Sequence, residues 1–265
     1  MTPFLKWAGG KRWLAKQLRE QFPSAIGTYV EPFLGSGAVF FDFLPKRAVL
    51  SDANSELIQT YLAVRDFPRE VHERLGEFHE IHSKEFYYAQ RSASPDDAIG
   101  RASRFIYLNR TCWNGLYRVN KKNQFNVPIG TKTAVLYPED NFQAISEALS
   151  SLEIKCCDFE VSIDEARFGD LIYVDPPYTV KHNLNGFLKY NQNIFSWDDQ
   201  VRLHDSLVRA RARGCHIVVS NADHQSVRDL YADFDDLRAV PRSSVIAGNS
   251  SARGATSELL VVHHG

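Results

Sequence analysis

The sequence predicts an α/β protein with a doubly wound, mainly parallel sheet and a second, mainly helical domain inserted into it. Three observations lead to this fold class. Strand and helix patterns alternate over residues 1–64 and again over residues 151–265. Helical periodicity alone dominates residues 65–150, which lie between them. Strands separated by helices form parallel sheets through right-handed crossovers, so we expect residues 65–150 to interrupt one sheet domain.

The expected strands are short apolar runs bounded by turn residues. They are residues 27–31, 47–51, 153–156, 170–174, 215–220, 234–240 and 258–263. We expect the last two to form a terminal hairpin that joins the sheet and adds an antiparallel strand at one edge.

The expected helices have apolar residues at helical spacing. They are residues 13–22, 37–44, 68–82, 97–110, 139–150, 160–166 and 198–212. A further helix runs to about Val64, with Asn54 or Ser55 as its N-cap. Pro23 ends the first helix, and the Asn- and Gly-rich residues 111–131 are typical of irregular structure.

The composition is that of an ordinary globular protein with a full core. Of the 265 residues, 44% are hydrophobic and 24% are charged, which argues against disorder. No apolar run approaches the ~18 residues of a membrane span, and the first residues are unlike a signal peptide. The four cysteines lack metal-type spacing and fit a reducing compartment. We therefore expect a cytoplasmic protein without a metal site or a membrane partner.

Charge is distributed unevenly, although the formal net charge is only −1. Residues 1–19 carry five basic side chains, residues 101–132 carry seven and residues 237–257 carry three, and none of these segments contains an acid. The rest of the chain holds all 32 acidic residues. Three acid-free segments can form one cationic face beside an acidic body, and such a face suits a nucleic-acid partner.

A glycine-rich turn follows the first expected strand and begins a helix. Its sequence is Phe33-Leu34-Gly35-Ser36-Gly37, and glycines allow close approaches that a Cβ would block. A doubly wound sheet binds nucleotide-like ligands at such a turn, and Asp52, after the second strand, is suited to ribose hydroxyls. A purely structural tight turn would have the same pattern. Phe40 stands where a dinucleotide fingerprint needs glycine, which disfavours a nicotinamide dehydrogenase.

These features favour an adenosine ligand without phosphates, of which S-adenosylmethionine (SAM) is a common one. Lys11, in Trp7-Ala8-Gly9-Gly10-Lys11, can bind the carboxylate of its methionine end, and Trp7 can stack on its adenine. Paired glycines before the lysine favour a backbone-defined loop over a solvated surface lysine.

The most specific motif is Asp175-Pro176-Pro177-Tyr178, directly after the expected strand 170–174. Two prolines fix two φ angles and keep each preceding residue extended. The segment presents a carboxylate, carbonyls that the sheet does not use and an aromatic face, which together suit a planar base with an exocyclic amine. Two acceptors on that amine favour a tetrahedral nitrogen with its lone pair toward a methyl donor, and the proton can leave afterwards. We expect all four residues to be catalytic.

Taken in order, the motifs resemble those of the Dam-type adenine-N6 DNA methyltransferases. The matching segments are residues 7–11, 33–37, 108–118, 125–130, 175–178, 220–223, 242–244 and 257–260. The resemblance spans about residues 3 to 262. It implies the Rossmann-like SAM-methyltransferase fold, SAM as cofactor and S-adenosylhomocysteine as product. The implied cofactor-binding residues are Trp7, Lys11, Phe33, Gly35, Ser36, Gly37, Asp52, Asp158, Phe159 and Asp175.

The resemblance also implies contacts with double-stranded DNA. The implied residues are Lys6, Arg110, Trp113, Asn114, Leu116, Arg118, Asn126, Pro128, Arg242, Ser243 and Ser244. A methyl donor cannot reach adenine N6 inside a duplex, so the base must be flipped out and the gap filled. Trp113, which replaces the tyrosine of close family members, and Asn114 would fill the gap. Arg118 would read a guanine in GATC.

Other residues of this set have supporting roles in the resemblance. Leu116 and Pro128 would contact neighbouring bases, and Lys6 would help at the outer base pair. The acid-free tail from Arg242 suits phosphate contacts. By contrast, we expect Phe105 and Tyr107, on a helix, to belong to a small core.

We therefore expect a site-specific DNA adenine methyltransferase without an obligate protein partner. Residues 1–64 and 151–265 would form its catalytic domain, and residues 65–150 its DNA-recognition domain. One alternative is methylation of another amine, namely cytosine N4, an RNA base or a protein glutamine, against which Asp175 argues. The other is a catalytically silent DNA-binding regulator, against which the set of Lys11, Asp52 and Asp175 argues.

Overall fold

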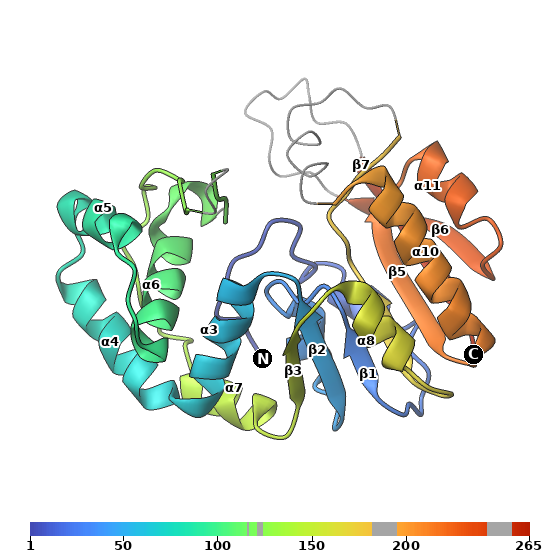
Figure 1. Ribbon diagram of the computed structural model, residues 1–265, viewed down its shortest axis with the longest axis horizontal. Coiled ribbons are helices and arrows are strands. Elements are labelled where there is room, and N and C mark those ends of the chain that lie inside the picture. The colour runs from blue at the N-terminus through green and yellow to red at the C-terminus, as the bar shows by residue number, and fades with distance from the viewer. Residues whose placement is uncertain (116, 121–123, 182–194, 243–255) are drawn as a thin grey trace. The chain divides into compact units, whose positions relative to one another are not determined.

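The protein is described here by a computed structural model of residues 1–265 (Figure 1). The structure describes all of them except residues 116, 121–123, 182–194 and 243–255. Among the described residues, no helix is long and apolar enough to cross a membrane.

The structure is mixed α/β, with seven strands in one sheet. The strands are β1 (Tyr29–Glu31), β2 (Ala48–Asp52), β3 (Glu153–Cys156), β4 (Leu171–Val174), β5 (His216–Ala222), β6 (Asp236–Arg242) and β7 (Thr256–His263). Their order is β3-β2-β1-β4-β5-β7-β6. The pairs β2–β3, β1–β4 and β4–β5 are parallel, which confirms the expected mainly parallel sheet. Every expected strand is present, with ends shifted by a residue or two.

The last two strands confirm the expected antiparallel hairpin. Strand β6 pairs with β7 from Asp236–Val262 to Arg242–Thr256. Strand β7 also pairs antiparallel with β5, where Ser220 lies opposite Leu260. The last strand of the chain therefore lies inside the sheet, between β5 and β6.

The helices match the sequence expectations with three differences. They are α1 (Ala15–Arg19), α2 (Ala38–Phe43), α3 (Ser55–Asp66), α4 (Pro68–Glu80), α5 (Lys84–Ser92), α6 (Ala98–Thr111), α7 (Phe142–Leu149), α8 (Phe159–Glu165), α10 (Trp197–Ala212) and α11 (Gln225–Leu230). Helix α1 is shorter than the expected residues 13–22. Helices α5 and α11 were not expected; both are short, and each buries one residue, Tyr87 or Val227.

The described chain divides into two compact units. Unit 1 consists of residues 1–16 and 34–157, and unit 2 consists of residues 17–33 and 158–265. In unit 1, α3 packs on α6 and α7 and also contacts β2 and β3, so the helices α4–α7 belong with these strands (Figure 1). Neither unit coincides with the expected DNA-recognition domain, residues 65–150. The functional boundaries of that domain stay a prediction.

Helix α3 begins at a capped residue, as expected. The Asn54 side chain accepts a hydrogen bond from the Leu57 amide at 3.1 Å, which satisfies one of the amides left over at the helix start. In unit 2, α10 packs on α8 and on β5, and all four residues of β4 are buried.

Arg110 corrects one sequence expectation, because it lies in the interior of unit 1. Its side chain is only 1% exposed and forms an ion pair with Asp140, with an Nη2–Oδ1 distance of 2.8 Å. The guanidinium also donates to the carbonyl oxygens of Phe4 at 2.9 Å and Val135 at 2.8 Å. These partners hold the first residues of the chain and the 135–140 loop to α6. The side chain is thus enclosed by protein, which argues against the expected DNA contact.

Removing the acid of this pair is expected to destabilise the protein strongly. Asp140→Ala leaves a buried guanidinium without its counter-charge, a change that typically costs about 3–5 kcal/mol. The decrease in the free energy of unfolding is measured by urea denaturation. Glu73→Ala is the control, because it removes an exposed ion pair with Arg69 and should leave the transition where it is. Equal transitions for the two variants would contradict the structural role of Arg110.

Candidate functional site

The glycine-rich turn of unit 1 rests on the end of β2. Gly35 and Gly37 have φ angles of +47° and +63°, in the region that favours glycine. The Gly35 amide donates to Asp52 Oδ2 at 3.1 Å, and the Leu34 amide donates to the Ser51 carbonyl at 3.0 Å. Tyr61 donates its hydroxyl hydrogen to the Gly35 carbonyl at 3.1 Å. The turn is therefore fixed from both of its sides.

Asp52 is a carboxylate held at the carboxyl end of β2. Its Oδ1 accepts a hydrogen bond from the Asn54 amide at 2.9 Å, while Oδ2 accepts the one from Gly35. Burial raises the pKa of Asp52, and the hydrogen bonds from Asn54 and Gly35 oppose that rise. Because each carboxylate oxygen has two lone pairs, Asp52 keeps acceptor capacity for hydroxyl groups.

The loop before α1 buries a cation. Lys11 is only 2% exposed, and its Nζ donates to the Gly9 carbonyl at 2.9 Å. Gly9 has a φ of +82°, and the Gly10 amide donates to the Trp7 carbonyl at 3.1 Å. A Cβ on Gly10 would lie 3.3 Å from that carbonyl. The loop conformation therefore requires its paired glycines and presents a buried ammonium, a group suited to a carboxylate.

Trp7 has aromatic partners within unit 1. Its ring stacks on Tyr117, with centroids 5.5 Å apart and planes at 18°, and lies 6.4 Å from Phe105. Its indole edge borders the glycine turn, since a Cβ on Gly35 would lie 2.8 Å from Trp7 Cδ1. Trp7 therefore packs the turn against the aromatic cluster, a role that the sequence did not suggest. Its contact with the cofactor adenine stays a prediction.

In unit 2, the Asp175–Tyr178 segment continues directly from buried β4. Strand β4 pairs with β1 and β5 in parallel, so the residues after these strands share one edge of the sheet. Burial raises the pKa values of the Tyr29 and Tyr173 hydroxyls. The hydrogen-bonded carboxylate of Glu31 raises that of Tyr29 further, and the negative charge of Asp175 contributes to both. Asp175 is therefore an acid within electrostatic range of two buried phenols at the end of the central strand.

Tyr178 is connected to buried polar groups on the neighbouring strands. Its hydroxyl lies 3.5 Å from Ser220 Oγ on β5, and Ser220 donates to Glu258 Oε2 on β7 at 3.0 Å. Burial, followed by the charges of Asp175 and Glu258, raises the pKa of the Tyr178 hydroxyl well above its usual value. The phenol is therefore neutral at pH 7. The segments 220–223 and 257–260, which hold Ser220 and Glu258, match the family motifs, but the resemblance implies no role for either residue.

Phe33 and Asp158 lie in one aromatic and ionic cluster of unit 2. Phe33 stacks on Phe159, with centroids 5.4 Å apart and planes at 24°. Asp158 caps α8 by accepting the Glu160 amide at 3.0 Å, and it forms a bidentate ion pair with Arg202. Burial alone would raise the pKa of Asp158, but the hydrogen bonds from Arg202 and Glu160 outweigh it and hold that pKa below its usual value.

Trp113 and Asn114 lie on an exposed one-turn helix that follows α6. Trp113 is 52% exposed, and its amide donates to the Pro128 carbonyl at 2.9 Å. Asn114 adopts a φ of +57°, which turns the backbone sharply between Trp113 and buried Gly115. An exposed indole on a backbone fixed in this way is suited to insertion between bases.

The Arg118 guanidinium is exposed and is oriented by Asn126. Its Nε donates to Asn126 Oδ1 at 2.9 Å, and the Asn126 amide donates to the Arg118 carbonyl at 3.1 Å.

Lys6 instead is half-buried, and its Nζ donates to the Tyr137 hydroxyl at 2.8 Å. Burial lowers the pKa of Lys6. Phe105 and Tyr107 are buried in the core, as expected.

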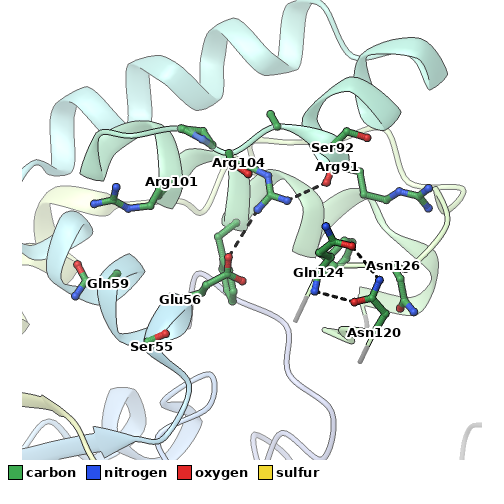
Figure 2. A pocket seen from close by; sticks show the side chains of 15 residues that line it. Ser55, Glu56, Gln59, Arg91, Ser92, Arg101, Arg104, Asn120, Gln124 and Asn126 are labelled. Carbon is green, nitrogen blue, oxygen red and sulfur yellow. Dashed lines mark hydrogen bonds and ion pairs between the residues drawn. The ribbon is translucent and has the colours of Figure 1, made fainter. Parts of the chain in front are cut away.

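A hollow of about 540 Å³ lies in unit 1 and is lined in part by Asn126 (Figure 2). Arg91, Arg101 and Arg104 line it together with Glu56. Arg104 lies 4.0 Å from Glu56 and donates to the Arg91 carbonyl at 3.0 Å. Guanidinium groups stay charged in proteins, so this wall is cationic beside the residue that orients Arg118.

Some expected site residues fall outside what the structure describes. These are Leu116, Ser243 and Ser244; Arg242 is the last residue of β6. Within the described ranges, no group of three or more His, Cys, Asp or Glu side chains is arranged to hold a metal ion, and none of the four cysteines forms a disulfide.

The structure has a mostly parallel sheet with an acid directly after its central strand, and open α/β sheets commonly bind ligands at the carboxyl ends of their strands. The chain belongs to the D12 class of N6 adenine-specific DNA methyltransferases, whose family model matches residues 7–242. It is therefore an enzyme of adenine methylation. This membership favours adenine over the alternatives of cytosine N4, RNA bases and glutamine, and it argues against a silent regulator.

Named relatives cover nearly the whole chain. A type II methyltransferase of Lactococcus lactis subsp. cremoris is 38% identical over 100% of this chain and 96% of its own. A type II methyltransferase of Methanocaldococcus jannaschii is 33% identical over 100% of this chain and 99% of its own. A DNA adenine methylase of Vibrio cholerae is 35% identical over 98% of this chain and 95% of its own.

The turn geometry predicts a difference between two glycine substitutions. Gly35→Ala adds a methyl group 2.8 Å from the Trp7 ring at a φ of +47°, whereas Gly169→Ala, at a φ of +75°, meets nothing within 4 Å. Both variants carry backbone strain of roughly 1 kcal/mol, and only Gly35→Ala adds a clash. We expect Gly35→Ala to lower the free energy of unfolding by at least about 1 kcal/mol more. Equal losses in urea denaturation would refute the packing of Trp7 on the turn.

Proposed function

We propose that this chain transfers a methyl group from SAM to the N6 of adenine in double-stranded DNA, at GATC, with the target base flipped out of the helix. The observation that carries the proposal is the Asp175–Tyr178 segment at the carboxyl end of buried β4, in a chain of the adenine-specific family. The product would be S-adenosylhomocysteine. An enzyme whose substrate is the DNA of a bacterium or phage would act in the cytoplasm.

The donor groups of the chain suit SAM. When bound, SAM supplies a methyl group on a positively charged sulfur. The buried Lys11 ammonium would hold its carboxylate, and the Asp52 carboxylate would accept its ribose hydroxyls. The Phe33–Phe159 pair and Asp158 offer an aromatic surface and an acceptor for its adenine and exocyclic amine. The positive φ angles of Gly35 and Gly37 support a turn that a ligand can approach closely.

The Asp175–Tyr178 segment would hold the target adenine. The Asp175 carboxylate and the Pro176 carbonyl each accept one hydrogen of the adenine amine, which turns the nitrogen lone pair away from the ring. Tyr178 stacks on the base, and its neutral hydroxyl, near Ser220, anchors the ring without adding charge. Asp175 also stabilises the positive charge that develops on the nitrogen. The surplus proton then leaves without a strong base.

Unit 1 would supply most of the expected DNA contacts. Exposed Trp113 fills the gap left by the flipped base, with Asn114 next to it. Arg118, oriented by Asn126, presents two N–H donors to O6 and N7 of a guanine. The cationic hollow lined by Arg91 and Arg101 suits the phosphate backbone (Figure 2).

A protection assay tests the proposal directly. Plasmid DNA from a host without adenine methylation is incubated with the full chain and SAM, and then with a nuclease that adenine methylation of GATC blocks. Resistance to cutting is the expected result. If the DNA is cut completely despite SAM but labelled methyl groups are incorporated at other sites, the recognition sequence is not GATC. If no label is incorporated into DNA, the proposed function is wrong.

Asp175→Ala is expected to abolish methyl transfer while leaving DNA binding nearly unchanged. The variant removes an acceptor for the target amine and touches none of the proposed DNA contacts. Methyl incorporation from labelled SAM and a DNA gel-shift measure the two properties. Asp229→Ala is the control, because its acid is exposed and, among the described residues, accepts a hydrogen bond from Gln225 on the same helix, α11. Loss of DNA binding in Asp175→Ala would mean that the acid acts in folding or docking.

Arg118→Ala is expected to relax specificity at one base pair. A bidentate contact to guanine discriminates by about 1–3 kcal/mol, so the ratio of kcat/KM for GATC to that for a site changed at the guanine should fall by that amount. Arg101→Ala, a cation of the hollow, should lower kcat/KM on both sequences alike. An unchanged ratio in Arg118→Ala would remove its assignment as the base reader.

A further inference from the structure

Arg202 on α10 is held by two acids at the beginning of α8 and by one acid on its own helix. Its Nη1 donates to Asp158 Oδ1 at 2.7 Å, and its Nη2 donates to Asp158 Oδ2 at 2.9 Å. Its Nη1 also donates to Glu160 Oε2 at 3.2 Å, and its Nη2 to Asp199 Oδ1 at 3.1 Å. The guanidinium carbon lies 4.3 Å from the centroid of the Phe159 ring.

The helix start of α10 positions this guanidinium. Ser196 and Asp199 form a capping box, in which the Asp199 amide donates to Ser196 Oγ at 3.1 Å and the Ser196 amide donates to Asp199 Oδ2 at 2.8 Å. The other oxygen of Asp199 accepts from Arg202, three residues further on. A contact on its own helix therefore holds the arginine in place. Its two Nη groups present a fixed pair of donors, which sets the orientation of the Asp158 carboxylate.

Stability alone does not account for this arrangement. The Arg202 and Asp158 side chains are 39% and 45% exposed, and ion pairs as open as this contribute little to stability. A carboxylate has about four acceptor positions, of which two are used by Arg202 and one by the Glu160 amide. Asp158 therefore keeps room for a further donor, in an orientation that the arginine sets.

The ring under the guanidinium belongs to the same cluster. Phe159 is buried, stacks on Phe33 and meets Phe195 at a centroid distance of 5.8 Å. A guanidinium over one ring face restricts the tilt of that ring by cation–π attraction. Arg202 thus acts on both groups, the acceptor Asp158 and the ring Phe159, that the proposed function assigns to the adenine of the cofactor.

We propose that Arg202 is a positioning residue for the cofactor adenine, which sets the orientation of the Asp158 carboxylate and braces the Phe159 ring without contacting the reacting atoms. The proposal rests on the proposed function, because it presumes that Asp158 and Phe159 bind SAM. It predicts that Arg202 controls cofactor affinity and leaves the methyl-transfer step itself unchanged.

The test measures binding of S-adenosylhomocysteine to the full chain by titration calorimetry. We expect Arg202→Ala to weaken binding about tenfold, since one oriented charge-assisted contact is lost. Arg202→Lys keeps the charge but cannot donate in a bidentate manner or lie flat on the ring, so its affinity should fall between those of the other two forms. The KM for SAM should rise with the dissociation constant, while kcat stays within about twofold of the original value.

Arg209→Ala is the matched control. Arg209 also lies on α10 and pairs with α8, through Glu160 at 2.6 Å and Asp164 at 2.8 Å, but the contacts found for it include neither Asp158 nor Phe159. Removing it breaks a comparable link between the two helices, and cofactor affinity should be unchanged. Equal weakening by Arg202→Ala and Arg209→Ala would assign both residues to helix packing and overturn the proposal.

A double-mutant comparison separates orientation from an independent contribution. If Arg202 acts through the acid, Arg202→Ala should cost much less affinity in an Asp158→Ala background than in the original chain. Equal losses in both backgrounds would overturn the proposal. Failure of the unaltered chain to bind S-adenosylhomocysteine would instead refute the proposed function itself, so the two failures are distinguishable.

Discussion

Unit 2 depends on one constraint, the point at which the chain leaves β4. Strand β4 is paired on both sides and fully buried, so the next residue leaves the sheet at a fixed point. Pro176 and Pro177 then keep the backbone extended, and the position of Asp175 follows from sheet pairing and not from a loop. The buried polar groups nearby, Tyr178, Ser220 and Glu258, are arranged around this exit.

Local sequence patterns predicted the elements well because each pattern reports on its own neighbourhood. All seven strands and the capped start of α3 at Asn54 depend on residues within a few positions of each other. Interactions between distant residues left no such signal. The resemblance implied that Arg110 contacts DNA, and nothing near it in the sequence shows its acid partner, which lies 30 positions away. The pairing of Asp158 with Arg202 spans 44 positions. The distribution of charge along the sequence does not reveal which cations pair with acids in the interior of the folded protein.

This limit also changes the meaning of the acid-free segment 101–132. Within this segment, Arg110 forms an ion pair with Asp140 in the core, and Arg104 is mostly buried beside Glu56. The exposed cations described in the segment are fewer than the sequence suggests, and Arg118 is one of them, held by a neutral amide instead of an acid. An exposed arginine that a neutral amide orients is the kind of group that can read a base edge.

The position of β7 has a consequence for the synthesis of the enzyme. It follows every other strand in the chain, yet it lies between β5 and β6 and carries Glu258, the acceptor of Ser220. A ribosome adds residues in order, so a nascent chain that ends before residue 256 has an unpaired β5 edge and lacks Glu258, the acceptor of Ser220. The packing behind Tyr178 is therefore completed only after β7 has been synthesised.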